Sequence, residues 1–134
     1  MNNTYGDLFI EIAKCADLCL KPWKHSVVSK NIDYKEPFLV NDFFELIIRI
    51  ETRNKEGARF SEHDLEVEIY RSGSELNITI AWDKYPDRPM LWQGKYSLWM
   101  DATTGKRCES FPNGTKLEGL SRRLRVLFSS ITSD

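Results

Sequence analysis

Hydrophobic and polar residues alternate strictly along two neighbouring segments in the middle of the chain. The segments cover residues 65–71 and 76–82, and a short Ser-Gly-Ser turn at residues 72–74 separates them. Alternation with a period of two places the apolar side chains on one face of a strand, and a glycine-containing turn between two such runs is typical of a β-hairpin. The pattern therefore predicts an antiparallel hairpin over residues 65–83, with one apolar face and one polar face.

Two further segments have apolar residues at steps of three and four, which is the spacing of an amphipathic helix. The first covers residues 5–20 and ends before Lys21-Pro22, and the second follows Thr115. Thr115 and Glu118 match the spacing of a capping box at a helix start. The apolar positions are Leu8, Phe9, Ile12, Cys15, Ala16 and Cys19 in the first segment, and Leu117, Leu120, Leu124, Leu127, Phe128 and Ile131 in the second.

Residues 43–52 fit two patterns. On a helical wheel their apolar side chains cover one side, and Asn41-Asp42 offers an N-cap, so we expect a central helix here. The alternative is a strand, because Leu46, Ile48 and Ile50 also alternate with charged neighbours and β-branched residues favour strands.

The chain is expected to leave the sheet after the hairpin and to return later. Residues 83–89 contain two prolines among charged residues, which a central strand does not tolerate. Alternation over residues 95–101 and a short polar run after the Gly105 turn predict returning strands near 95–109. The whole chain, residues 1–134, is therefore predicted to be a single α+β domain. Its antiparallel sheet would have three to four strands, namely the hairpin and the returning strands, packed against an N-terminal, a central and a C-terminal helix.

The aromatic residues suggest a candidate binding surface. If Leu98 and Met100 pack inward, Trp99 faces outward on the side of the hairpin that carries Tyr70 and Thr79. Exposed Trp and Tyr side chains are typical anchors for a protein partner or for stacked bases. The alternative is a sheet that helices cover on both sides. The full candidate surface comprises Tyr70, Thr79, Trp92, Trp99, Arg122 and Arg125.

Composition narrows the function classes. A chain of 134 residues with 41% hydrophobic and 29% charged positions is typical of one soluble globular domain, and its net charge of -1 gives no overall positive field for nucleic acid. The sequence contains no apolar run of the ~18–20 residues that span a bilayer, and no leader pattern. We therefore expect a cytoplasmic protein with no membrane partner.

Residues capable of metal or acid–base chemistry are few. An odd number of cysteines argues against a disulfide framework, and Cys15 and Cys19 lie on the apolar stripe of a predicted helix, so we expect them in the core. No metal site and no cofactor are predicted. His25 and His63 lie in predicted loops beside serines, but no Gly-x-Ser-x-Gly, phosphate-loop or His-Glu-x-x-His motif accompanies them.

Three hypotheses on function follow from these observations. The leading one is a non-enzymatic cytosolic interaction module of the adaptor, chaperone or assembly-factor type, with a protein partner or with self-association as a homodimer. The alternative is a single-stranded nucleic-acid-binding protein that uses the sheet aromatics and the arginines of the last helix. The third is a small enzyme with a site near His25 and His63.

Overall fold

A computed structural model describes residues 4–32, 43–112 and 114–130. Six strands form one antiparallel sheet in the order β1-β2-β3-β4-β5-β6, so each strand pairs with its neighbour along the chain. The elements are α1 (Tyr5–Cys19), β1 (Lys24–Ser29), β2 (Phe43–Arg53), the 3-10 helix η1 (Ser61–His63), β3 (Leu65–Ser72), β4 (Glu75–Trp82), β5 (Met90–Gln93), β6 (Ser97–Met100) and α2 (Gly114–Ser130). The predicted α+β class is confirmed, and in the described residues it contains two helices and six strands.

The predicted hairpin is confirmed. β3 and β4 pair from Leu65 opposite Trp82 to Ser72 opposite Glu75, with Gly73 at a positive φ of 61° in the turn. A residue with a side chain would be strained at this φ, whereas glycine adopts it readily. The apolar residues of both strands lie on one face and are buried, as their alternation predicts.

The predicted central helix at residues 43–52 is wrong, because this segment is the strand β2. β2 pairs with β1 on one side and β3 on the other, and it buries Leu46, Ile48 and Ile50 completely. A helix would have spread these three residues around its circumference, whereas a strand places them on one face beside Val67 and Ile69. The tertiary pairing therefore decides between two local patterns that the sequence leaves open.

Two strands in the sheet were not firmly expected from the sequence. β1 has only one adjacent pair of apolar residues, and β5 begins directly after Pro89 and has four residues. The returning strands expected near 95–109 are present as β6 and as a single bridge between Met100 and Arg107.

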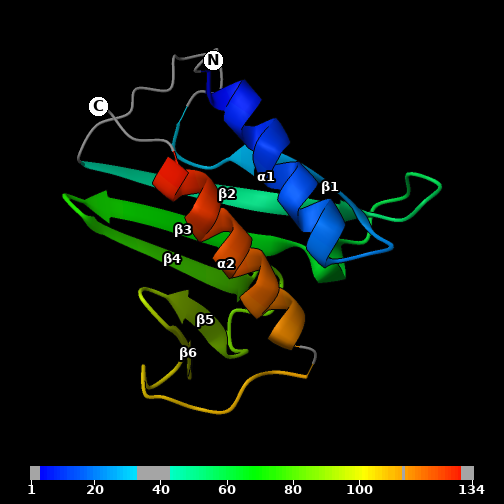
Figure 1. The fold of residues 1–134 in the computed structure, drawn as a ribbon. Coiled ribbons are helices and arrows are strands. Elements are labelled where there is room, and N and C mark those ends of the chain that lie inside the picture. Colours follow the sequence, from blue (N-terminus) through cyan, green and yellow to red (C-terminus); the bar gives the residue numbers. More distant parts are fainter. Residues whose placement is uncertain (1–3, 33–42, 113, 131–134) are drawn as a thin grey trace.

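Both helices lie on the same face of the sheet (Figure 1). α1 packs against β1 and α2, and α2 packs against β4 and β5. At the start of α1, the Thr4 side chain accepts a hydrogen bond from the Asp7 N–H and so caps the helix. The fully buried side chains between the helices and the sheet include Ile12, Leu46, Ile48, Ile50, Leu65, Ile69, Ile78, Ile80, Leu91, Leu120, Leu124 and Phe128.

Neither α1 nor α2 covers the opposite face of the sheet, which is rich in charge. Glu45 and Glu68 are exposed there, and Lys30 pairs with Glu66 and, at 3.5 Å, with Asp83. We call this surface the open face. Of the two described helices, neither has the length and apolar character that a membrane crossing needs.

Candidate functional site

Trp99 is not on the open face, which corrects the surface predicted from the sequence. Only 7% of Trp99 is exposed, and it pairs across β5–β6 with the buried Leu91. Because β5 inserts between β4 and β6, the register of β6 places Trp99 on the helix-covered face and turns Leu98 to the open face. The indole Nε1–H donates to Glu118 of α2 at 3.3 Å. Glu118 therefore binds Trp99 rather than closing the predicted capping box with Thr115, and Thr115 lies inside α2 because the helix begins at Gly114.

Three of the other predicted surface residues share the open face. Thr79 lies opposite Trp92, and Tyr70 is 36% exposed with its ring 5.7 Å from that of Phe43. Trp92 is half-buried, and its ring lies against Gly94, where a Cβ atom would come within 2.6 Å of the indole. A binding role for this group stays a prediction.

The two predicted arginines lie apart from these aromatics. Arg122 is exposed on α2, and Arg125 donates to the main-chain oxygen of Leu76 at 2.7 Å. Since α2 covers the face opposite to Tyr70 and Trp92, the structure does not bring the arginines and the open-face aromatics into one surface.

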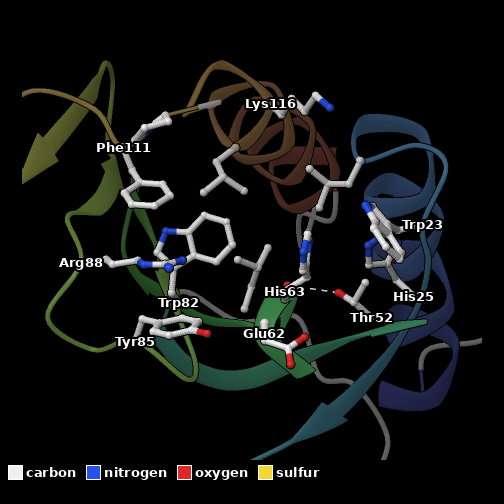
Figure 2. Close-up of a pocket in the computed structure, with 14 residues that line it drawn as sticks. Trp23, His25, Thr52, Glu62, His63, Trp82, Tyr85, Arg88, Phe111 and Lys116 are labelled. Carbon is white, nitrogen blue, oxygen red and sulfur yellow. Dashed lines mark hydrogen bonds between the residues drawn. The ribbon is translucent and has the colours of Figure 1, made fainter. Parts of the chain in front are cut away.

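A pocket of about 310 Å³ lies at one end of the sheet, where the end of α1, the start of α2, η1 and the β4–β5 loop meet. We call it the end pocket. Figure 2 shows two opposing walls, one with Trp82, Tyr85, Arg88 and Phe111, and the other with Trp23, His25, Thr52 and His63. Its lining residues are Leu20, Trp23, His25, Thr52, Glu62, His63, Leu65, Trp82, Tyr85, Arg88, Phe111, Pro112, Lys116 and Leu117. The structure thus brings both histidines of the chain to one cavity.

His25 belongs to an Asp–His pair that links α1 to β1. Its Nδ1 lies 2.9 Å from Asp17 Oδ1, and its side chain is only 1% exposed. Burial lowers the pKa of His25 below its ordinary value, although the Asp17 carboxylate opposes this effect. The imidazole is therefore neutral at neutral pH. Its Nδ1–H donates to Asp17, which leaves Nε2 as a hydrogen-bond acceptor that is buried and has no partner among the described residues.

A buried carboxylate fixes the segment that carries His63. Asp64 is 1% exposed and accepts hydrogen bonds from the Thr52 N–H at 2.8 Å and from the Arg59 guanidinium at 2.8 and 2.7 Å. Burial alone would raise the pKa of Asp64, but the hydrogen bonds from Arg59 and Thr52 outweigh it and hold the pKa below its ordinary value. The Thr52 hydroxyl in turn donates to the His63 carbonyl oxygen at 3.1 Å. These bonds place the His63 ring 4.9 Å from that of Trp23.

Aromatic rings hold a cation on the opposite wall. The Arg88 guanidinium lies 3.7 Å from the ring centre of Tyr85, 4.5 Å from that of Phe111 and 5.4 Å from that of Trp82. Among the described residues, no side chain or main-chain oxygen accepts a hydrogen bond from this guanidinium. The Trp82 Nε1–H on the same wall is also buried without a partner. This wall therefore presents several hydrogen-bond donors that lack an acceptor.

The cysteines lie outside the end pocket. Cys15, Cys19 and Cys108 are free and half-buried, and they pack against the core, so the burial expected for Cys15 and Cys19 is only partial. Burial raises the pKa of the Cys15 and Cys19 thiols. Within residues 4–32, 43–112 and 114–130, no three His, Cys, Asp or Glu side chains are grouped as metal ligands.

Sequence reasoning missed the donor wall. Arg88, Tyr85 and Phe111 lie in irregular segments, where no periodicity shows which way a side chain points. The sequence offered one signal for this site, which was the density of aromatic residues between Trp82 and Trp99. Which of these aromatic side chains lie on each side of the sheet depends on the position of β5.

We expect His25 to make the stability of the domain sensitive to mild acid. Because its pKa is lowered in the folded state, the unfolded chain takes up this proton first as the pH falls below about 6.5. The free energy of unfolding should therefore decrease below that pH. The variant His25→Asn retains a donor for Asp17 but does not titrate, so its urea denaturation curves between pH 5 and pH 7.5 should vary less with pH. An equal pH dependence in wild type and variant would contradict this expectation, and His63→Asn provides the control.

Comparison with models of protein families gives a match that covers most of the chain. A family model described as "Domain of unknown function (DUF8659)" matches residues 9–127, which includes all of the end pocket. Searches of curated proteins and of solved structures find no match to the chain. The chain therefore belongs to the family of the domain of unknown function DUF8659.

Proposed function

We propose that this domain is a non-enzymatic, cytoplasmic interaction module that binds its target in the end pocket. One observation carries the proposal: two buried hydrogen-bonding atoms, Trp82 Nε1 and His25 Nε2, belong to the lining of the same pocket and have no partner among the described residues. Leaving a buried polar atom unpaired costs about 1–3 kcal/mol, and native proteins rarely retain such atoms without a reason. Both atoms have less than 1 Å² of exposed surface, so a ligand that recovers this cost must shift the side chains around them when it binds.

The lining of the pocket supports recognition more strongly than catalysis. The Thr52 hydroxyl is already bonded to the His63 carbonyl oxygen, and the Tyr85 ring is stacked on Arg88. Most of the remaining lining is aromatic or aliphatic surface with a few polar and charged groups, which are the usual elements of a ligand site.

The Asp17–His25 pair favours a second candidate function, a small enzyme. A carboxylate on Nδ1 leaves Nε2 able to take up a proton, which is the arrangement of a general base. The two functions differ in the fate of the ligand. A binding module returns the ligand chemically unchanged after prolonged incubation, and an enzyme converts it, which mass spectrometry of the recovered ligand distinguishes.

The experiment that tests the binding site is a fragment screen read by nuclear magnetic resonance. The chain has four tryptophans, and their indole N–H signals can be assigned from four single Trp→Phe variants. We expect fragments that bind to shift the signal of Trp82, because a ligand would accept its unpaired N–H. The signal of Trp92 on the open face should stay in place and is the internal control. The library contains acids, bases and neutral compounds, so this outcome does not depend on ligand charge.

The variant Trp82→Phe tests whether the indole N–H contributes to ligand binding. It removes the unpaired N–H but keeps an aromatic ring, so the free protein should stay folded while fragment binding weakens about tenfold. Trp92→Phe, the same substitution outside the pocket, should leave binding unchanged. If no fragment shifts the Trp82 signal, or if fragments shift only the Trp92 signal, the end pocket is not the binding site.

A further inference from the structure

We propose that the ligand of the end pocket is a small aromatic acid, with its anionic group on the Arg88 wall. This inference rests on the proposed function and adds the chemical class of the ligand. It follows from the polarity of the groups that the pocket leaves without partners.

Most unpaired polar groups on one wall are donors, and the Tyr85 hydroxyl can donate or accept. The guanidinium carbon of Arg88 lies over the rings of Tyr85 and Phe111, and no described residue accepts a hydrogen bond from its N–H groups. The buried Trp82 Nε1–H belongs to the same wall, and Figure 2 shows Arg88 extending toward Trp82. Arg88 is half-buried, so water can accept its N–H groups in the free protein, and a ligand group with several lone pairs can replace that water. A carboxylate or a phosphate fits best, because its charge also matches the guanidinium.

The surrounding charges favour an anion at this wall. Lys116 lies in the first turn of α2, where the helix dipole is positive, and it has no ion pair with any described residue. The one carboxylate in the lining, Glu62, belongs to η1 and therefore to the other wall. Figure 2 shows Lys116 above the pocket with its ammonium directed away from Arg88, so Arg88 is the cation that an anion at this wall meets.

The opposite wall calls for a hydrogen-bond donor on the ligand. His25 Nε2 is an acceptor when Nδ1–H is bonded to Asp17, and Glu62 is an acceptor as well. A hydroxyl or amino group at the far end of the ligand from its acid would pair with the exposed Glu62, or with His25 Nε2 once the side chains around that atom shift. The pocket thus distinguishes the two ends of its ligand by polarity.

The space between the walls suits a ring. The tilted pair of Trp23 and His63 flanks one side, and Trp82 and Phe111, with ring centres 5.6 Å apart, flank the other. Aromatic walls favour a planar ligand, through stacked and edge contacts. A volume of about 310 Å³ is at the small end of the range for small-molecule sites, so we expect a compact free acid.

The experiment is isothermal titration calorimetry of the intact domain with a defined panel of compounds. The acids are benzoate, 4-hydroxybenzoate, 4-aminobenzoate and phenyl phosphate, and the neutral analogue is 4-hydroxybenzamide. We expect one molecule of acid per chain, with 4-hydroxybenzoate bound more tightly than benzoate and about tenfold more tightly than the amide. The carboxylate and phosphate arms identify the preferred anion.

Two arginine variants locate the anion. Arg88→Gln should weaken binding of 4-hydroxybenzoate about tenfold and should reduce its advantage over the amide, because the charge that distinguishes the two ligands is gone. Arg122→Gln is the same substitution at an exposed position of α2 outside the pocket, and it should leave both affinities unchanged. Circular dichroism of each variant checks folding. If Arg88→Gln does not fold, the wild-type protein alone tests the inference. An affinity for 4-hydroxybenzoate that is no higher than the affinity for the amide would then contradict it.

The outcomes separate this inference from the proposed function. If fragments shift the Trp82 signal but neutral or basic compounds bind as well as the acids, the pocket is a binding site and the inference of an acid is wrong. Binding of an acetylated tripeptide that ends in tyrosine, without binding of any free acid, would also overturn it, because the occupant would then be a protein end. If no compound of any class binds, the proposed function itself fails.

Discussion

Replacing Trp99 by alanine should lower the free energy of unfolding by about 3–5 kcal/mol, the usual cost of removing a large aromatic side chain from a core. The indole lies between Leu91 on β5 and the first turn of α2, and it donates to Glu118. Its Cζ2 atom would come within 2.7 Å of a Cβ atom at Gly114, so the ring and the start of α2 are in close contact. Chemical denaturation followed by circular dichroism measures this loss.

The matched control is Trp92→Ala, because Trp92 is on the neighbouring strand but on the open face. Half-buried side chains lose less on truncation, so we expect less than half of the effect of Trp99→Ala. A third variant, Trp99→Phe, keeps most of the ring but removes the hydrogen bond to Glu118. Loss of this bond should lower the free energy of unfolding by about 1 kcal/mol, in addition to the effect of the smaller ring. Equal losses for the two alanine variants would contradict the placement of Trp99 in the core.

Asp64→Asn should lower the free energy of unfolding by about 2–3 kcal/mol at pH 7. Removing one partner of a buried ion pair costs about 3–5 kcal/mol, and the partial exposure of Arg59 reduces this figure. Asparagine keeps an acceptor for the Thr52 N–H, so the variant isolates the charge. Thermal and urea denaturation at neutral pH measure the difference from wild type.

The effect of Asp64→Asn should also depend on pH, with a definite sign. Because the pKa of Asp64 is lowered in the folded state, its contribution is complete above the ordinary value of 3.8 and is lost as the pH falls through the folded pKa. Wild type and variant should therefore approach the same stability in strong acid. Glu62→Gln alters an exposed carboxylate two residues away and is the control. A difference that persists unchanged in strong acid would show that shape, rather than charge, accounts for the loss.

The parts of the fold that sequence predicts well are those in which one local pattern dominates. The hairpin of β3 and β4 has strict alternation on both sides of a glycine turn, and α1 and α2 have clear helical spacing. β2 satisfies both periodicities within eleven residues, and only its pairing with β1 and β3 selects the strand. β5 is too short for periodicity to be recognised.

The error over Trp99 followed from that short strand. Alternation along β6 shows that Trp99 and Leu98 face opposite sides, but it does not show which side is covered. That choice depends on the register between β5 and β6, which pairs Trp99 with Leu91. The end pocket was beyond sequence reasoning for a similar reason. His25, His63 and Arg88 come from segments far apart in the chain, and only the antiparallel order of the strands brings them to one end of the sheet.

The end pocket forms late in the synthesis of this domain, because its walls include residues next to both α1 and α2. Its walls combine residues that follow α1, such as Trp23 and His25, with residues around the start of α2, such as Phe111 and Lys116. Domains are made from the N-terminus onward, and in this sheet each strand pairs with the one made just before it. The sheet can therefore assemble on the ribosome strand by strand, while the pocket closes only after the beginning of α2 has emerged. A ligand of the pocket would accordingly bind only chains whose synthesis has passed the start of α2.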